Sequence, residues 1–141
     1  MIPAPNEKTA ATTCTVLFVD DEDVLLEIGR QMLEHLSHTV IEARSGKEAI
    51  LEFTQHKDRI DLIILDILMP EMNGTETYKR LKAIDPQARV IIASGFAIDD
   101  TVKNLLDDGA IGFLPKPFTL QELSMKVQKA LEHRVKCYGS D

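Results

Sequence analysis

Cysteine is scarce in this chain: Cys14 and Cys137 are its two cysteines among 141 residues, and they lack the spacing of metal ligands. We therefore expect reduced thiols, as is usual for a cytoplasmic protein. The last predicted helix should run antiparallel to the first predicted strand and end near its start. A regulatory disulfide between the two cysteines therefore stays open as a second possibility.

Long apolar runs are missing as well, and basic residues are in the minority. The longest apolar runs have the length of a strand, too short to span a bilayer, and the start M-I-P-A-P-N-E-K lacks the apolar core of a signal peptide. The 16 Lys and Arg residues are outnumbered by 23 Asp and Glu residues, which gives a net charge of −7. Nucleic-acid surfaces need clustered Lys and Arg, so this balance argues against one. We expect a cytoplasmic chain that binds neither nucleic acid nor a membrane.

What the sequence does contain is a regular alternation of short apolar runs and amphipathic segments. The predicted strands are residues 15–19, 39–43, 61–65, 89–93 and 110–114, with 61–65 at the centre. The predicted helices lie within 21–36, 45–53, 74–85, 98–108 and 120–131. Five strand–helix pairs predict one α/β domain with a parallel sheet, right-handed crossovers and helices on both faces. The domain is expected to cover residues 14–135, between tails at 1–13 and 136–141.

Apolar residues at helical spacing predict the buried face of each helix. The stripe expected in the first helix is Val24, Ile28, Met32 and Leu36, broadened by Leu25 and Leu33. The inward residues expected in the third and fifth helices are Tyr78, Leu81, Ile84, Leu120, Leu123, Val127 and Leu131. Ser45 and Glu48 predict a capped start to the second helix. Four histidines without metal spacing are expected to be exposed to solvent: His35, His38, His56 and His133.

Three carboxylates and one lysine stand where apolar runs end. Asp20 and Asp21 follow V-L-F-V, and Asp66 follows L-I-I-L. Lys116 follows F-L-P. The carboxyl ends of parallel strands meet at one edge of a sheet, where α/β proteins bind ligands. Grouped acids beside a lysine suit a divalent cation together with an anion, because the acids would otherwise repel one another.

Further motifs are in register with these charges. Asp66 begins D-I-L-M-P and is followed by N-G, Ser94 comes after the fourth predicted strand, and Lys116 lies in F-L-P-K-P-F. In the type, order and spacing of these motifs, the chain from about Cys14 to Leu131 resembles the receiver domain of two-component response regulators. It is especially similar to stand-alone regulators and to receivers at the ends of hybrid histidine kinases. The resemblance implies a flavodoxin-like fold, with five parallel strands in the order 2-1-3-4-5 and five helices.

The resemblance also implies a role for each residue of the site. Asp66 would be the phosphoacceptor, which takes a phosphoryl group from the phosphohistidine of a histidine kinase or phosphotransfer protein. Lys116 and Ser94 would contact phosphoryl oxygens, through an ammonium charge and a hydroxyl hydrogen bond. Mg²⁺ would be bound by Asp20, Asp21, Asp66 and the backbone carbonyl of Leu68. A cis peptide bond is implied before Pro117.

Ser94 and Phe113 would form a conformational switch, as the corresponding residues do in the resembling family. In that family, phosphorylation draws the Ser toward the phosphoryl group, and the aromatic residue of the fifth strand moves into the space left behind. The face made by the fourth helix, fifth strand and fifth helix changes as a result. Phe113 lacks the hydroxyl of the Tyr that many relatives carry. We expect no turnover enzyme, but a monomer or phosphorylation-dependent dimer that binds a downstream protein target through this face.

Three other classes of protein remain alternatives. A receiver fold used only for docking is disfavoured, because no residue of the active site is missing. A hydrolase of the haloacid dehalogenase type needs a second Asp two residues after its nucleophile, where this chain has Leu68. A flavin carrier would need a hydroxyl-rich phosphate loop, whereas D-D-E-D after the first strand would repel phosphate in the absence of a metal.

Two further expectations depend on particular positions. Leu68 lies two residues after the acceptor and Phe96 two residues after Ser94, beside the route that an attacking water takes in relatives. Two apolar side chains offer that water no hydrogen bond, so slow self-dephosphorylation is predicted. The chain after Leu131 is too short for a DNA-binding effector. Output would therefore pass through protein contacts or through another part of a larger polypeptide.

Overall fold

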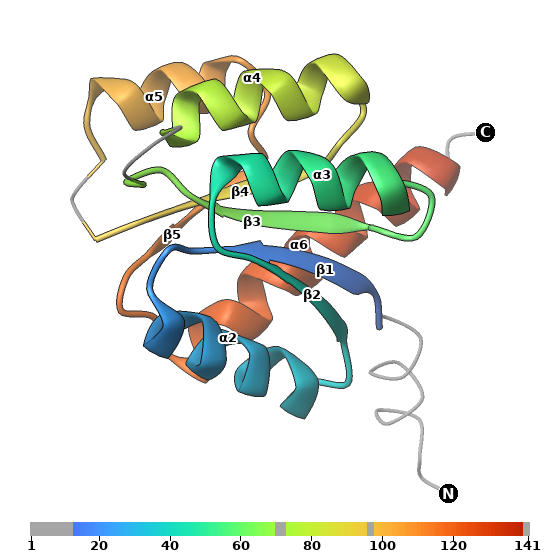
Figure 1. Cartoon of the computed structure of the whole chain (residues 1–141). Helices are drawn as coiled ribbons and strands as arrows, with labels where there is room; N and C mark the ends of the chain where they lie inside the picture. The colour runs from blue at the N-terminus through green and yellow to red at the C-terminus, as the bar shows by residue number, and fades with distance from the viewer. Residues whose placement is uncertain (1–12, 70–72, 96–97, 140–141) are drawn as a thin grey trace, which may run out of the picture.

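The computed structural model describes residues 13–69, 73–95 and 98–139, with side chains as far as residue 132. Five parallel strands form one sheet in the order β2-β1-β3-β4-β5 (Figure 1). The strands are β1 (Thr15–Val19), β2 (Thr39–Ala43), β3 (Leu62–Asp66), β4 (Val90–Ser94) and β5 (Gly112–Pro115). The helices are α2 (Asp23–His35), α3 (Gly46–His56), α4 (Gly74–Ile84), α5 (Asp100–Asp107) and α6 (Leu120–Gly139). This arrangement confirms the predicted flavodoxin-like α/β fold.

The helices cover the two faces of the sheet in two groups (Figure 1). α2 and α6 pack on one face, where Phe18, Leu26 and Leu123 belong to one apolar core. α3, α4 and α5 pack on the other face, where Phe53 and Tyr78 belong to a second core. Every residue of β3 and β4 is buried, since both strands have a helix layer on each side. Burial on both faces explains why their sequences are unbroken apolar runs.

The buried face of α2 differs from the predicted stripe. Of the predicted stripe, Val24 is 68% exposed and Ile28 is 42% exposed, whereas Leu33 is buried and Met32 and Leu36 pack against the core. The other buried residues of the helix are Leu26 and Gly29, which the predicted stripe did not include. A Cβ atom added to Gly29 would lie 2.2 Å from Cε2 of Phe18, so the helix approaches the sheet most closely at a residue without a side chain. A search for apolar periodicity cannot find a glycine at the centre of a buried face. In α6, three of the four residues predicted to face inward are buried. The prediction is wrong for Leu120, which is exposed at the first position of the helix.

The prediction that all histidines are exposed is wrong for His38, which is 5% exposed. The short turn between α2 and β2 places His38 against the start of β1, where its Nδ1 accepts a hydrogen bond from the Cys14 N–H at 3.1 Å. Burial lowers the pKa of His38. His35 is exposed, and His56 is half-buried beside Glu52. The side chains of His133 and Cys137 lie outside the described residues, so the disulfide alternative stays a prediction.

The ends of the elements follow local sequence signals. The predicted cap at Ser45 is confirmed, since its hydroxyl accepts a hydrogen bond from the Glu48 N–H at 3.1 Å. Gly109 follows α5 with a φ of +117°, a conformation that favours glycine. α6 continues to Gly139, into the range 136–141 expected as a tail, while residues 1–12 of the other expected tail lie outside the described residues. In the described part of the chain, no helix is both long and apolar enough to cross a membrane.

Candidate functional site

Three carboxylates meet at the carboxyl edge of the sheet. Asp20 directly follows β1, Asp21 comes next in the loop before α2, and Asp66 is the last residue of β3. One ligand oxygen from each lies within 4.8 Å of the others. Asp20 and Asp66 are buried, and Asp21 is partly open to solvent. Because β1 and β3 are neighbouring parallel strands, their ends bring together residues that are 46 positions apart, as the sequence predicted.

Lys116 connects two of these carboxylates. Its Nζ lies 2.8 Å from Oδ2 of Asp20 and 3.3 Å from Oδ2 of Asp66. The Lys116 N–H donates a hydrogen bond to the backbone oxygen of Ser94 at 2.8 Å, which fixes the start of the β5–α6 loop to the end of β4. The peptide bond between Lys116 and Pro117 is cis. The ammonium group thus lies in the acidic pocket itself, a contact with Asp20 that the sequence reasoning did not include.

Burial raises the pKa of Asp66 to about 6. The hydrogen bond from the Leu68 N–H and the charge of Lys116 act against burial, while the charge of Asp20 adds to it. For Lys116, burial lowers the pKa, but the hydrogen bond to Asp20 and the charge of Asp66 outweigh burial and the pKa is raised. The pocket therefore holds a carboxylate whose ionised form is disfavoured by burial and partly stabilised by Lys116, beside an ammonium that the carboxylates keep protonated.

Ser94 and Phe113 occupy neighbouring strands of the same half of the sheet. Ser94 is buried at the end of β4, one residue beyond Ala93, which pairs with Leu114 of β5. Phe113 is half-buried and packs against the core beneath α3, α4 and α5. Ser94 and Phe113 thus lie on adjacent, hydrogen-bonded strands, close to the edge of the sheet that carries Asp66.

The loop after Asp66 presents its residues to solvent unevenly. Leu68 is 52% exposed, whereas Ile67 and Met69 are buried. The Leu68 N–H bonds Oδ1 of Asp66 at 3.1 Å, so the backbone of Leu68 stays close to the carboxylate. Residues 70–72 of this loop and Phe96, the second residue of the predicted water-excluding pair, lie outside the described residues.

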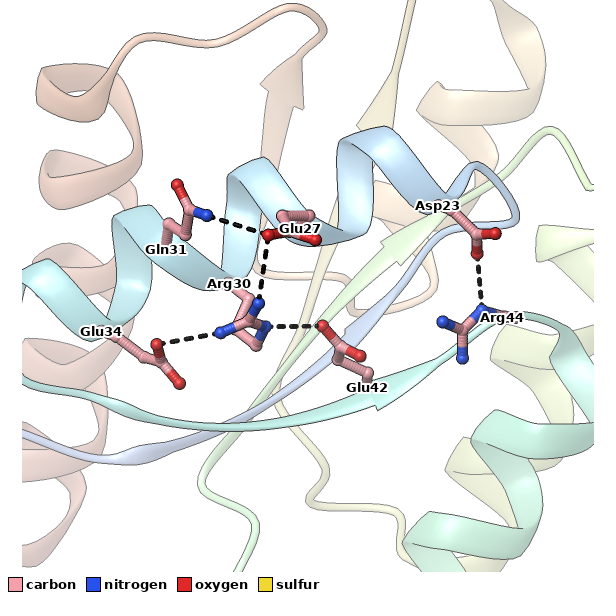
Figure 2. Close-up of polar contacts among 7 residues, drawn as sticks. All are labelled: Asp23, Glu27, Arg30, Gln31, Glu34, Glu42 and Arg44. Carbon is pink, nitrogen blue, oxygen red and sulfur yellow. Dashed lines mark hydrogen bonds and ion pairs between the residues drawn. The ribbon is translucent and has the colours of Figure 1, made fainter.

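Polar contacts hold the acidic loop and α2 in place. Oδ1 of Asp20 accepts a hydrogen bond from the Glu22 N–H at 3.0 Å, and the Asp20 N–H bonds Ala43. Arg44 pairs with Asp23 in the first turn of α2 at 2.6 Å (Figure 2). Farther along α2, Arg30 lies between three carboxylates (Figure 2): Glu27, Glu34 and Glu42. These ion pairs are exposed or partly buried, and each adds little stability, about 0–1 kcal/mol. Of the three pairs of Arg30, the one with Glu42 links α2 to β2.

The donor set of the pocket suits a hard divalent cation. Its three carboxylates supply oxygen ligands, which are the ligands that such a cation prefers. No cluster of three or more potential ligands other than this one occurs among the described residues. Lys116 adds a positive charge on the same side, which suits an anionic group bound beside the cation.

Comparison with known proteins agrees with this geometry. The family model described as "Response regulator receiver domain" matches residues 16–128. The chain is 38% identical over 120 residues to the sensor kinase CckA of Brucella abortus, covering 85% of this chain and 13% of the kinase. It is 32% identical to a cyclic di-GMP phosphodiesterase of Thermotoga maritima, covering 86% of this chain and 32% of that protein. The chain thus spans only part of the length of these relatives.

Solved structures with the same fold match this chain over most of their own length. A response regulator receiver domain protein from Clostridium thermocellum aligns with a TM-score of 0.83 at 31% identity, covering 88% of this chain and 98% of that chain. The CheX–CheY–BeF3–Mg²⁺ complex from Borrelia burgdorferi aligns with a TM-score of 0.79 at 31% identity, covering 82% and 87%. The strand order, the acidic pocket and the family match together show that this chain belongs to the response regulator receiver domain family.

Proposed function

We propose that this chain is a phosphoacceptor switch that takes a phosphoryl group from the phosphohistidine of a histidine kinase, or of a phosphotransfer protein, onto Asp66. The observation that carries the proposal is the Lys116 ammonium, placed 3.3 Å from Asp66 within a pocket of three carboxylates. Such a pocket concentrates charged groups around Asp66, and phosphoryl transfer depends mainly on positioning and on electrostatic stabilisation. It is an acceptor modified once per signal and not a turnover enzyme on a diffusible substrate.

In the proposed reaction an oxygen of Asp66 forms a bond to phosphorus as the bond from phosphorus to the donor nitrogen breaks. The electron pair of the broken bond returns to the imidazole nitrogen of the donor. Lys116 compensates negative charge on one phosphoryl oxygen, and the Ser94 hydroxyl donates a hydrogen bond to another. Mg²⁺, when bound by Asp20, Asp21, Asp66 and the Leu68 carbonyl, supplies further positive charge to the phosphoryl oxygens.

The phosphorylated protein would signal through its surface. A phosphoryl group adds a charge of about −1.5 to −2, which favours the conformation in which Ser94 contacts it and Phe113 turns inward. The face of α5, β5 and α6 would then bind a downstream protein target, or a second copy of the chain in a phosphorylation-dependent dimer. We place these events in the cytoplasm, where histidine kinases obtain ATP.

Intact-mass measurement after incubation with Mg²⁺ and phosphoramidate tests the proposal. The wild-type protein should gain one phosphoryl group, and Asp66→Asn should gain none. Asp58→Asn is a matched control, since Asp58 is an exposed carboxylate outside the pocket and its removal should leave the gain unchanged. A folded wild-type protein that gains no mass would instead support the docking module, which uses a receiver fold without phosphorylation.

A further inference from the structure

A cavity of about 230 Å³ lies next to the acceptor at the edge of the sheet. Its walls come from four segments of the chain and include Leu68, Asn73, Ser94 and Asp99. Leu68 and Ser94 also border the acceptor pocket, because one follows Asp66 and the other ends the neighbouring strand. The cavity is therefore placed where a group bound to the phosphoryl donor would lie.

Asp99 is the charged residue among the described residues that line this cavity. Its Oδ1 accepts a hydrogen bond from the Val102 N–H at 3.1 Å and so caps α5. On the opposite wall, Asn73 caps α4 through its neutral amide oxygen. A helix N-terminus carries about half a positive charge, which would favour an anion here. Asp99 is exposed, and its full negative charge exceeds the half charge of α5 at its own wall, while the half charge of α4 on the opposite wall is not compensated by its neutral cap. Removing the charge of Asp99 would therefore leave two positive helix ends around the cavity.

The charge of the departing group differs between two classes of phosphodonor. When a nitrogen–phosphorus bond breaks, the electron pair returns to a nitrogen that is protonated, and the group leaves as a neutral or cationic amine or imidazole. When an acyl phosphate reacts, the electron pair stays on a carboxylate oxygen and the group leaves as an anion. The leaving group departs in line, on the side of phosphorus away from Asp66. A negative wall beside this path disfavours the anion.

We propose that Asp99 is a specificity-determining residue that makes the site prefer nitrogen–phosphorus donors to acyl phosphates. The inference rests on the proposed phosphorylation of Asp66 and adds the class of donor to it. Two unit charges about 4–8 Å apart in water interact strongly enough to change a rate about two- to fivefold. The phosphoryl group itself is anionic in both classes of donor, so its repulsion by Asp99 cancels in the ratio of their rates.

The test compares the rate constants for phosphorylation by phosphoramidate and by acetyl phosphate, measured by intact mass at low ionic strength in Mg²⁺. Asp99→Asn should lower the ratio of the phosphoramidate rate to the acetyl phosphate rate about two- to fivefold. Asn is as good a helix cap as Asp, so α5 should start at the same residue. Asp100→Asn is the matched control, because it removes an equal charge one residue away that does not line the cavity, and its ratio should stay close to wild type.

Salt supplies a second readout that a change of structure would not reproduce. Since the effect is Coulombic, the difference between wild type and Asp99→Asn should shrink as ionic strength rises to about 1 M, where the Debye length is about 3 Å. An unchanged ratio in Asp99→Asn, or an equal change in Asp100→Asn, would overturn the inference while leaving phosphorylation of Asp66 in place. A folded wild-type protein that neither donor labels would overturn the proposed function, and this inference with it.

Discussion

Replacing Asp66 with Asn should stabilise the metal-free protein at neutral pH. The pKa of Asp66 is about 6 in the folded chain against a usual value of 3.8, so the unfolded chain ionises first as pH rises. The contribution of Asp66 to the free energy of unfolding therefore falls between about pH 4 and pH 6, and it stays at its lowest value above pH 6. A difference of about 2 units corresponds to about 3 kcal/mol, which sets the upper limit of the gain. The amide oxygen of Asn can still accept the hydrogen bond that the Leu68 N–H donates to Oδ1 of Asp66. The amide NH2 then replaces Oδ2 opposite Lys116 and loses that contact, which reduces the gain below this limit.

Urea denaturation of both proteins at pH 4 and pH 7.5, with chelator present, measures this effect. The free energy of unfolding of Asp66→Asn should exceed that of wild type by about 1–3 kcal/mol at pH 7.5 and should nearly equal it at pH 4. Asp58→Asn, at an exposed carboxylate, should show no such dependence on pH. Wild-type stability equal to or above that of Asp66→Asn at pH 7.5 would refute the reasoning that ionised Asp66 is destabilised by burial.

Three further results are expected. Asp21→Ala should weaken Mg²⁺ binding at least tenfold in titration calorimetry, because it removes one of three carboxylate ligands, and unchanged affinity would count against the metal site. Beryllofluoride with Mg²⁺ should change NMR chemical shifts along α5 and α6 while leaving α3 nearly unaffected, whereas shifts confined to the pocket would exclude a switch through Ser94 and Phe113. Leu68→Asn should accelerate loss of the phosphoryl group several-fold at unchanged Mg²⁺ affinity, since an exposed amide can orient water where Leu68 cannot. First-order decay as slow as that of wild type would exclude a role of Leu68 in keeping water from the phosphoryl group.

The sequence could predict the acidic pocket because parallel topology converts strand order into position. Asp20 and Asp66 end apolar runs, and the ends of neighbouring parallel strands must share one edge. The order of the strands needed more than periodicity, and the resemblance of the motifs supplied it. The pairing of Lys116 with Asp20 was not predictable in the same way. It depends on the rotamer of a long side chain that comes from a loop 96 residues away from Asp20.

Other differences arise where packing depends on residues without an apolar signal. Gly29 centres the buried face of α2 because Phe18 fills the space that a Cβ would need, and apolar spacing pointed instead to Val24 and Ile28. His38 is buried because a short turn places it beside Cys14, a contact between residues 24 positions apart. The ion pair of Arg30 with Glu42 joins α2 to β2 and likewise depends on tertiary geometry (Figure 2).

The central claim is that Asp66 itself carries the phosphoryl group. Borohydride reduces an acyl phosphate to an alcohol, which converts a phosphorylated aspartate to homoserine. After incubation with phosphoramidate and Mg²⁺, reduction and peptide mapping by mass spectrometry should place homoserine at position 66 and at no other aspartate. Homoserine at Asp20 or Asp21, or full labelling with aspartate intact at position 66, would contradict the account.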